Sequence, residues 1–162
     1  MRLTDSRIKR TIENSGGNFV PEEFFHGRNN LKNKAVKELV EWRNWMGFKF
    51  QITSAYRQTG SHKYGSSFDG LIWSKWKTEQ PEPDHIWRLM TTWKWHGVGI
   101  YFDWKNGIGS HVDIVPRTLR TRPLRWIRVE GTYYYQDLKT GIFRAESGKT
   151  TTLENEIQIY NF

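Results

Sequence analysis

Residues 97–115 read GVGIYFDWKNGIGSHVDIV, and the architecture expected for the whole chain starts from this segment. Two short apolar runs, residues 98–102 and 111–115, flank a Lys-Asn-Gly triplet that favours a turn. Runs of this kind around such a turn are typical of paired antiparallel strands. In the second run, His111 and Asp113 alternate with apolar residues, so both point to the same side of the strand. Burying the apolar side would direct His111 and Asp113 toward a cleft.

The segments before this hairpin predict two helices and another strand. Residues 30–46 follow a helical period, with one apolar stripe formed by Leu31, Ala35, Leu39, Trp42 and Met46. Gly47 ends the stripe, and the alternation over residues 48–52 then predicts a strand. A second helix is expected after Pro83, with Asp84 as its cap.

This order of elements predicts an α+β fold with a small antiparallel sheet flanked by helices. Residues 54–70 contain many serines and glycines and are expected to form a loop. We expect residues 1–117 to form the core, with residues 1–30 as a lead-in that turns at Gly16-Gly17. Residues 118–162 are expected to be a basic, aromatic β extension packed on that core.

The extension begins with an arginine-rich run and continues with a hairpin pattern. Residues 126–143 are rich in aromatic side chains and predict two strands joined by a turn at residues 137–141. A last strand is expected from the apolar residues Leu153, Ile157, Ile159 and Tyr160. The hairpin looks like one copy of the Trp/Tyr repeat of choline- and glucan-binding wall modules, which need several copies to form a binding site. The alternative interpretation is a hairpin that extends the core sheet.

The charge and cysteine content restrict the partners and the chemistry. The formal net charge is +8, and a basic surface favours an anionic partner such as nucleic acid or a cell-wall polymer. No apolar run approaches roughly 18 residues, so no membrane span is expected. The chain has no cysteine, so any metal site has to use His, Asp or Glu, which suits zinc or another divalent first-row ion.

Three residues form a candidate zinc site. A catalytic zinc site has three protein ligands and one open position. His62 and Asp69 flank a glycine-containing segment that could fold both side chains onto one ion, and His111 would complete the set. From the residues alone, the alternative is that His62 caps a turn and His111 is an ordinary strand residue.

Four sequence blocks together resemble a known family. They are SAYR at 54–57, GSHKYGSSFD at 60–69, GIY at 99–101 and HVD at 111–113. In this order they resemble the zinc D-Ala-D-Ala carboxypeptidases and L-Ala-D-Glu endopeptidases, a family that includes phage endolysins and shares its fold with the hedgehog signalling domain. The resemblance covers roughly residues 18–117. It implies a hedgehog/DD-peptidase-like core.

The resemblance also implies roles for individual residues. His62, Asp69 and His111 would be the zinc ligands, and Arg57 would bind a substrate carbonyl or carboxylate through its planar guanidinium. The main departure lies three residues before His111, where many members carry a Glu or Asp general base and this chain has Ile108. Asp113 is then the nearest candidate base, and its alternative role is to orient a metal ligand. Asp103 and His96 are further candidates for the base.

These observations favour a zinc-dependent peptidase that cleaves stem peptides of bacterial peptidoglycan, as a phage lysis or entry enzyme would. The N-terminus MRLTDSR lacks the apolar segment of a secretory signal, so we expect synthesis in the cytoplasm and action at the periplasm or cell wall of a bacterial host. One alternative is a non-catalytic wall-binding or virion protein on the same scaffold. A nucleic-acid-binding protein is less favoured, because no groove-reading helix or RNA-binding fingerprint is present.

Overall fold

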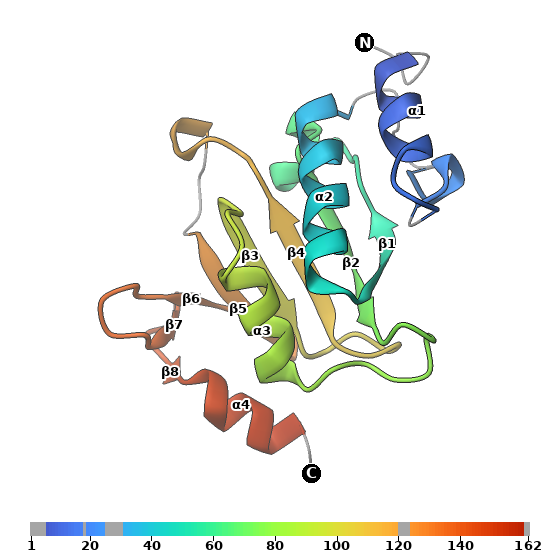
Figure 1. The fold of residues 1–162 in the computed structure, drawn as a ribbon. Coiled ribbons are helices and arrows are strands. Elements are labelled where there is room, and N and C mark those ends of the chain that lie inside the picture. The colour runs from blue at the N-terminus through green and yellow to red at the C-terminus, as the bar shows by residue number, and fades with distance from the viewer. Residues whose placement is uncertain (1–5, 18, 25–30, 120–123, 161–162) are drawn as a thin grey trace.

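The computed structural model describes residues 6–17, 19–24, 31–119 and 124–160. Within these residues, helices and one mixed sheet of eight strands form an α+β fold (Figure 1). The helices are α1 (Ser6–Glu13), α2 (Asn33–Met46), α3 (Pro83–Thr91) and α4 (Leu153–Tyr160), with short 3-10 segments η1 (Pro21–Phe24), η3 (Gly60–Tyr64) and η4 (Arg117–Leu119). The strands are β1 (Lys49–Ser54), β2 (Ser67–Trp73), β3 (Gly97–Tyr101), β4 (Gly109–Asp113), β5 (Arg125–Val129), β6 (Thr132–Gln136), β7 (Phe143–Ala145) and β8 (Thr150–Thr151).

The sheet has the strand order β1-β2-β4-β3-β5-β6-β7-β8. The expected hairpin is confirmed, because β3 and β4 pair antiparallel with Gly99 opposite His111. The expectation of a small, purely antiparallel sheet was too narrow, since β5 joins β3 in parallel and extends the sheet well beyond the core. Local patterns carry no information about such a pairing, because the two strands are distant in sequence.

The two predicted helices are confirmed, with one difference at a cap. Gly47 ends α2 in the left-handed conformation, with φ of 71°, and its backbone N–H donates to the Arg43 carbonyl. Pro83 occupies the first turn of α3, where its missing N–H costs nothing. The helix cap is Glu82 rather than Asp84, and Asp84 instead forms an ion pair with Arg88 one turn later.

The expected loop over residues 54–70 was wrong in its second half. The chain forms η3 at Gly60–Tyr64 and then enters β2, whose first six residues are all buried. A strand buried on both faces shows no alternation of polar and apolar residues, so its serines and glycine resemble a loop. Asp69 therefore lies on β2, an interior strand of the sheet, rather than in the expected loop.

The lead-in contributes to the core. Ile8 and Ile12 of α1 are 2% and 0% exposed, and α1 packs beside α2. The turn expected at Gly16-Gly17 is present, and both glycines have positive φ values. Helix α1 therefore fills part of the hydrophobic core that a bare lead-in would leave open.

The C-terminal extension continues the core sheet. The expected turn at residues 137–141 is confirmed, because it joins β6 to β7 and these two strands pair antiparallel. An additional turn at Glu130-Gly131 divides the first expected strand into β5 and β6, which also pair antiparallel. Ile127, Tyr134 and Phe143 are at most 5% exposed and belong to the same core cluster as the helices.

The last predicted strand is a helix. Residues Leu153–Tyr160 form α4, and Ile159 and Tyr160 are 66% and 44% exposed, so the expectation that they would be buried in a strand was wrong. Thr152 begins the helix by accepting a hydrogen bond from the backbone N–H of Asn155, which is the local interaction that favours a helix start.

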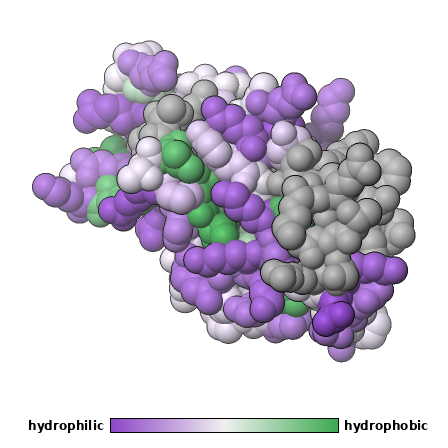
Figure 2. All heavy atoms as spheres, turned by 90° about the horizontal axis from the view of Figure 1, so that it is seen from above, coloured by the Kyte–Doolittle hydropathy of each residue, from purple (hydrophilic) through white to green (hydrophobic). Residues whose placement is uncertain are grey.

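The sheet has two distinct faces, and strand alternation assigns residues to each. Val98, Ile100 and Val112 belong to the core cluster on the side where α2 and α3 lie (Figure 1). Gly99 and His111 point to the opposite side, which we call the site face. Seen from above, the molecular surface is largely hydrophilic and shows hydrophobic residues mainly in one narrow strip (Figure 2). Within the described residues, no helix is both long and apolar enough to span a membrane.

Candidate metal centre

The sheet register aligns the key positions in one row across four strands. Asp69 on β2 is opposite His111 on β4, and His111 is opposite Gly99 on β3. Gly99 is in turn paired with Trp126 on β5. Residues in such a row project from the same face of the sheet. Two of the expected ligands are therefore direct cross-strand neighbours, although 42 positions separate them in sequence.

The third expected ligand, His62, reaches the row from the 3-10 segment η3. Its Nδ1 donates to the Ala55 carbonyl at 2.8 Å, which fixes the tautomer and leaves Nε2 available. Nε2 lies 3.1 Å from Oδ2 of Asp69 but lacks the alignment that a hydrogen bond requires. Gly65 ends η3 in the left-handed conformation and lets the chain turn directly into β2. His62 is therefore a fully buried imidazole with one nitrogen directed at Asp69.

His111 is held between two carboxylates. Its Nδ1 lies 2.6 Å from Oδ1 of Asp69, and its Nε2 lies 3.0 Å from Oδ2 of Asp113. The other oxygen of Asp113 accepts the backbone N–H of Val115 at 2.9 Å. Asp113 is 0% exposed, and both of its carboxylate oxygens are engaged. The orientation of the His111 ring is therefore set from the side opposite Asp69.

The pKa values of this cluster follow from burial and close contacts. Burial opposes charge on Asp69, but the hydrogen bond with His111 and the nearby imidazole of His62 outweigh it and hold the pKa of this carboxyl well below its usual range. Burial also opposes charge on His111, but its hydrogen bonds to Asp113 and Asp69 raise its pKa to about 9. The two buried carboxylates thus favour a positive charge at this position, which a proton or a metal cation can supply.

The three side chains fit a metal ion. Ligand atoms of His62, Asp69 and His111 all lie within 4.8 Å of one another, and all three residues are buried. The second nitrogen of each imidazole is bound to a carbonyl or a carboxylate, as is usual for histidines that ligate a metal. Two imidazoles and one carboxylate form a donor set that suits a divalent ion of the first transition row. The cluster could therefore hold a metal.

Arg57 lies at the solvent side of this cluster. Its Nη1 is 3.1 Å from Oδ2 of Asp69, and its side chain is 47% exposed. The guanidinium is thus in contact with a ligand and also open to an incoming molecule. The role expected for Arg57 in binding a substrate carbonyl or carboxylate stays a prediction.

The other residues considered as a base lie elsewhere. Asp103 forms an ion pair with Arg128 at 2.9 Å and accepts the backbone N–H of Gly131. The Nδ1 atom of His96 lies 3.2 Å from the Val115 carbonyl oxygen. Ile108, at the family's base position, is 2% exposed and belongs to the hydrophobic core. The structure therefore brings Asp113, and neither Asp103 nor His96, to the ligands.

Two aromatic residues of the site face were missed from the sequence. The Trp126 ring lies 4.8 Å from that of His111 between centroids, and it covers Gly99 so closely that a Cβ there would clash with the indole. Tyr101 lies on the same face of β3, two residues from Gly99. The glycine was the available signal, because a strand glycine often marks close approach of another group.

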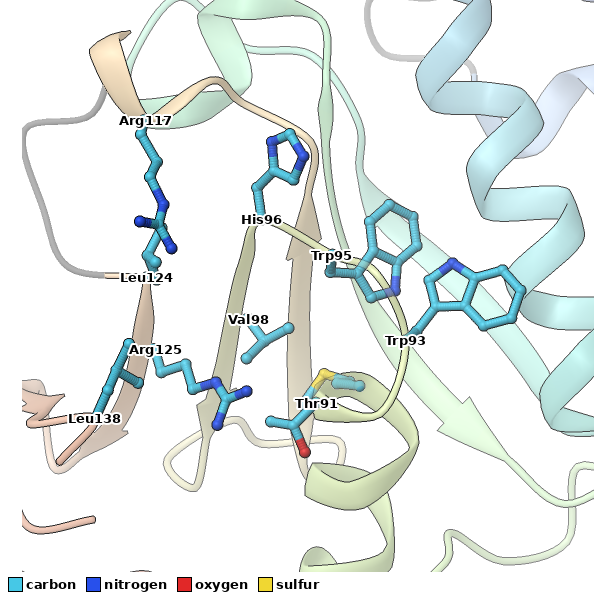
Figure 3. A pocket seen from close by; sticks show the side chains of 10 residues that line it. Thr91, Trp93, Trp95, His96, Val98, Arg117, Leu124, Arg125 and Leu138 are labelled. Atoms are coloured by element: carbon cyan, nitrogen blue, oxygen red, sulfur yellow. The ribbon is translucent and has the colours of Figure 1, made fainter. Parts of the chain in front are cut away.

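A separate cavity of about 390 Å³ lies at the start of β3, and none of the three ligands lines it (Figure 3). Val98, a core-side residue, lines its wall, and the side chains of Arg117 and Arg125 reach toward it (Figure 3). His96 lies at its edge, and the described lining contains no acidic residue. The cavity is therefore electropositive and distinct from the metal centre.

Comparisons with protein-family models, curated proteins and solved structures find no match for this chain.

Proposed function

We propose that this protein is a zinc-dependent peptidase that cleaves stem peptides of bacterial peptidoglycan. The observation that carries the proposal is the buried cluster of His62, Asp69 and His111, in which both imidazoles direct one nitrogen at the carboxylate and have the other nitrogen bound. The sequence blocks around these residues resemble zinc peptidases of the cell wall. We further propose that residues 18–117 adopt the hedgehog/DD-peptidase fold.

The three residues would hold zinc, and the chain leaves no thiolate to compete with them. When bound there, zinc would supply a Lewis acid and an acidified water for attack on a peptide carbonyl. The Ala55 carbonyl keeps His62 in the tautomer that presents Nε2, and Asp113 keeps the His111 ring in position.

Arg57 would bind the substrate. Peptidoglycan stem peptides carry free carboxylates, and a guanidinium binds a carboxylate through two parallel hydrogen bonds. Arg57 combines a contact to the ligand Asp69 with an exposed side chain, so a carboxylate bound to it would lie next to the metal centre. The net charge of +8 would also attract an anionic polymer.

The test of the function is digestion of purified peptidoglycan with mass spectrometry of the products, combined with elemental analysis of protein purified without chelator. Release of shortened stem peptides or free D-alanine, abolished by chelator and restored by zinc, is the expected result. A protein with bound zinc that leaves every stem peptide intact would contradict peptidase activity.

Wall binding without catalysis is the second candidate, and the cavity lined by Arg117 and Arg125 favours it. A non-catalytic wall protein would sediment with purified sacculi in a salt-dependent way and release no peptide. Salt-dependent DNA binding by metal-free protein would instead favour a nucleic-acid partner.

Arg57→Lys is expected to lower kcat/KM by about ten- to a hundredfold, because hydrogen bonds to charged groups contribute about 1.5–3 kcal/mol and lysine lacks the planar fork. Zinc content should stay normal, since Arg57 is not one of the three ligands. The matched control is Arg88→Lys on the exposed surface of α3, which should behave as wild type. Unchanged cleavage in Arg57→Lys would show that Arg57 does not contact substrate.

Asp113→Asn is expected to reduce zinc affinity or activity by roughly ten- to a hundredfold, because Asp113 positions His111. A general base would behave differently, with a rate loss of about a hundredfold to ten-thousandfold at full zinc content. Zinc content and rate measured on the same preparation separate the two roles. Asp84→Asn on the surface of α3 serves as the control, and an Asp113→Asn protein identical to it would remove Asp113 from the mechanism.

A further inference from the structure

Trp126 reaches the candidate metal centre from the C-terminal extension, outside the residues that carry the resemblance to zinc peptidases. It lies on β5, two strands away from His111 on β4, with Gly99 of β3 between them. Two strand spacings amount to about 10 Å, so only a large side chain that crosses β3 can contact the imidazole. The indole makes this contact, with its centroid 4.8 Å from that of His111. Trp126 therefore links the extension to a candidate metal ligand.

Gly99 makes the contact possible. A side chain at this position would project from the same face of the sheet as Trp126 and His111, and even a Cβ would clash with the indole. Because β3 has no side chain here, the indole fills the space above the strand and is only 7% exposed. The indole therefore rests on the backbone of β3 beside the imidazole, with little room to move.

The hydrogen bonds of His111 leave the tilt of its ring to be set by packing. Rotation of an imidazole about its Cβ–Cγ bond is broad, and hydrogen bonds weaken steeply only below about 120°. A binding site needs its side chains held within about 10–20° of the productive geometry, which requires packing as well as hydrogen bonds. The rings of His62 and Trp126 both contact the His111 ring. Of these two, Trp126 is not a candidate ligand, so it can hold the ring before the metal arrives.

The environment of Trp126 separates it from the hydrophobic core. The core cluster contains its neighbour Ile127 but not Trp126 itself, which is buried on the site face instead. None of the described residues accepts a hydrogen bond from its buried indole N–H, which is a cost that phenylalanine would avoid. What the indole adds over phenylalanine is the reach to span β3 and contact the imidazole of His111.

We propose that Trp126 is a positioning residue of the metal centre. Its indole holds the imidazole of His111 at the angle that lets Nδ1 bind a divalent metal ion together with His62 and Asp69. This inference rests on the metal site of the proposed function. It deepens that function by making the C-terminal extension a part of the site.

The test compares Trp126→Leu with Phe143→Leu in the full-length protein. Both changes replace a buried aromatic side chain of the extension, but Phe143 packs on Trp87 of α3, away from the candidate ligands. The measurements are the Kd for zinc by calorimetry, the visible spectrum with bound Co²⁺, which reports ligand geometry, and thermal stability without metal. Trp126→Leu should weaken zinc binding by about ten- to a hundredfold and change the cobalt spectrum. Phe143→Leu should lower stability and leave the zinc Kd and the cobalt spectrum unchanged.

Gly99→Ala provides an independent test, because the added methyl group should displace the indole without removing it. This variant should weaken zinc binding by about the same factor as Trp126→Leu. In the double variant Gly99→Ala/Trp126→Leu the clash is absent, so its loss should not exceed that of Trp126→Leu alone.

Three results would overturn the inference: a Trp126→Leu protein with the wild-type zinc Kd and cobalt spectrum, an equal loss in Phe143→Leu, or additive losses in the double variant. If the wild-type protein binds neither zinc nor cobalt, the inference and the proposed function fail together. If it binds zinc but cleaves no stem peptide, the proposed peptidase fails alone, and the zinc Kd values still decide the role of Trp126.

Discussion

His62→Ala and His111→Ala are each expected to lose the bound metal almost completely, from about one zinc per chain to near zero, and to lose stem-peptide cleavage with it. Each change removes one of three ligands from a centre whose donor atoms lie within 4.8 Å of one another. The remaining pair cannot complete a three-ligand catalytic site. Elemental analysis after gel filtration in chelator-free buffer, together with zinc titration by calorimetry, measures the loss.

His96→Ala is the matched control for both variants. Its imidazole is exposed, lines the separate cavity and contacts the Val115 carbonyl, so its removal should leave zinc content unchanged. Circular dichroism of each variant distinguishes metal loss from unfolding. Full metal content in both His62→Ala and His111→Ala would place the metal site elsewhere in the chain.

Truncation after Arg117 is expected to give an unfolded or insoluble protein. The deletion removes the parallel partner of β3 and takes Ile127, Tyr134 and Phe143 out of the core. Truncating a single buried side chain of this size typically costs about 2–5 kcal/mol, whereas a whole domain is stable by only about 5–15 kcal/mol. Soluble yield, circular dichroism and zinc content are the measurements.

Truncation after Thr152 is the control, because it removes residues 153–162 and with them no strand of the sheet. Its losses to the core are the partly buried side chains of Leu153 and Ile157, whereas Ile159 and Tyr160 are exposed. This shorter deletion should leave a folded protein that retains zinc. If the longer truncation also gave a folded, zinc-binding protein that merely failed to sediment with sacculi, the extension would be a wall-binding arm rather than a part of the sheet.

Local sequence patterns predicted the elements whose period is unambiguous. The apolar stripe of α2 is one example. The alternation of His111 and Asp113 on β4 is another, and the structure places Nε2 of His111 3.0 Å from Oδ2 of Asp113. Sequence patterns gave a wrong prediction where burial on both faces removes the alternation of polar and apolar residues, as in β2, which contains Asp69. They also failed for α4, because the spacing of its four apolar residues within eight positions does not distinguish a short strand from a helix.

The candidate site was predictable in its composition but not in its surroundings. The ligand set came from sequence blocks with a fixed spacing, and the structure brings all three side chains together. Trp126 could not be assigned, because its place beside His111 depends on the pairing of β3 with β5. Such non-local pairing follows from the global fold, which a local period does not specify.

The pairing of β5 with β3 also determines the order in which this protein can assemble during synthesis. The ribosome releases the N-terminal part of a chain first, so all three ligand residues emerge before Trp126 does. Until the extension has emerged, β3 lacks its parallel neighbour, and long-range parallel pairing forms more slowly than a hairpin. A nascent chain thus carries the complete ligand set on an unfinished sheet. A site assembled in this order would be complete only once β5 has paired with β3 and brought Trp126 beside His111.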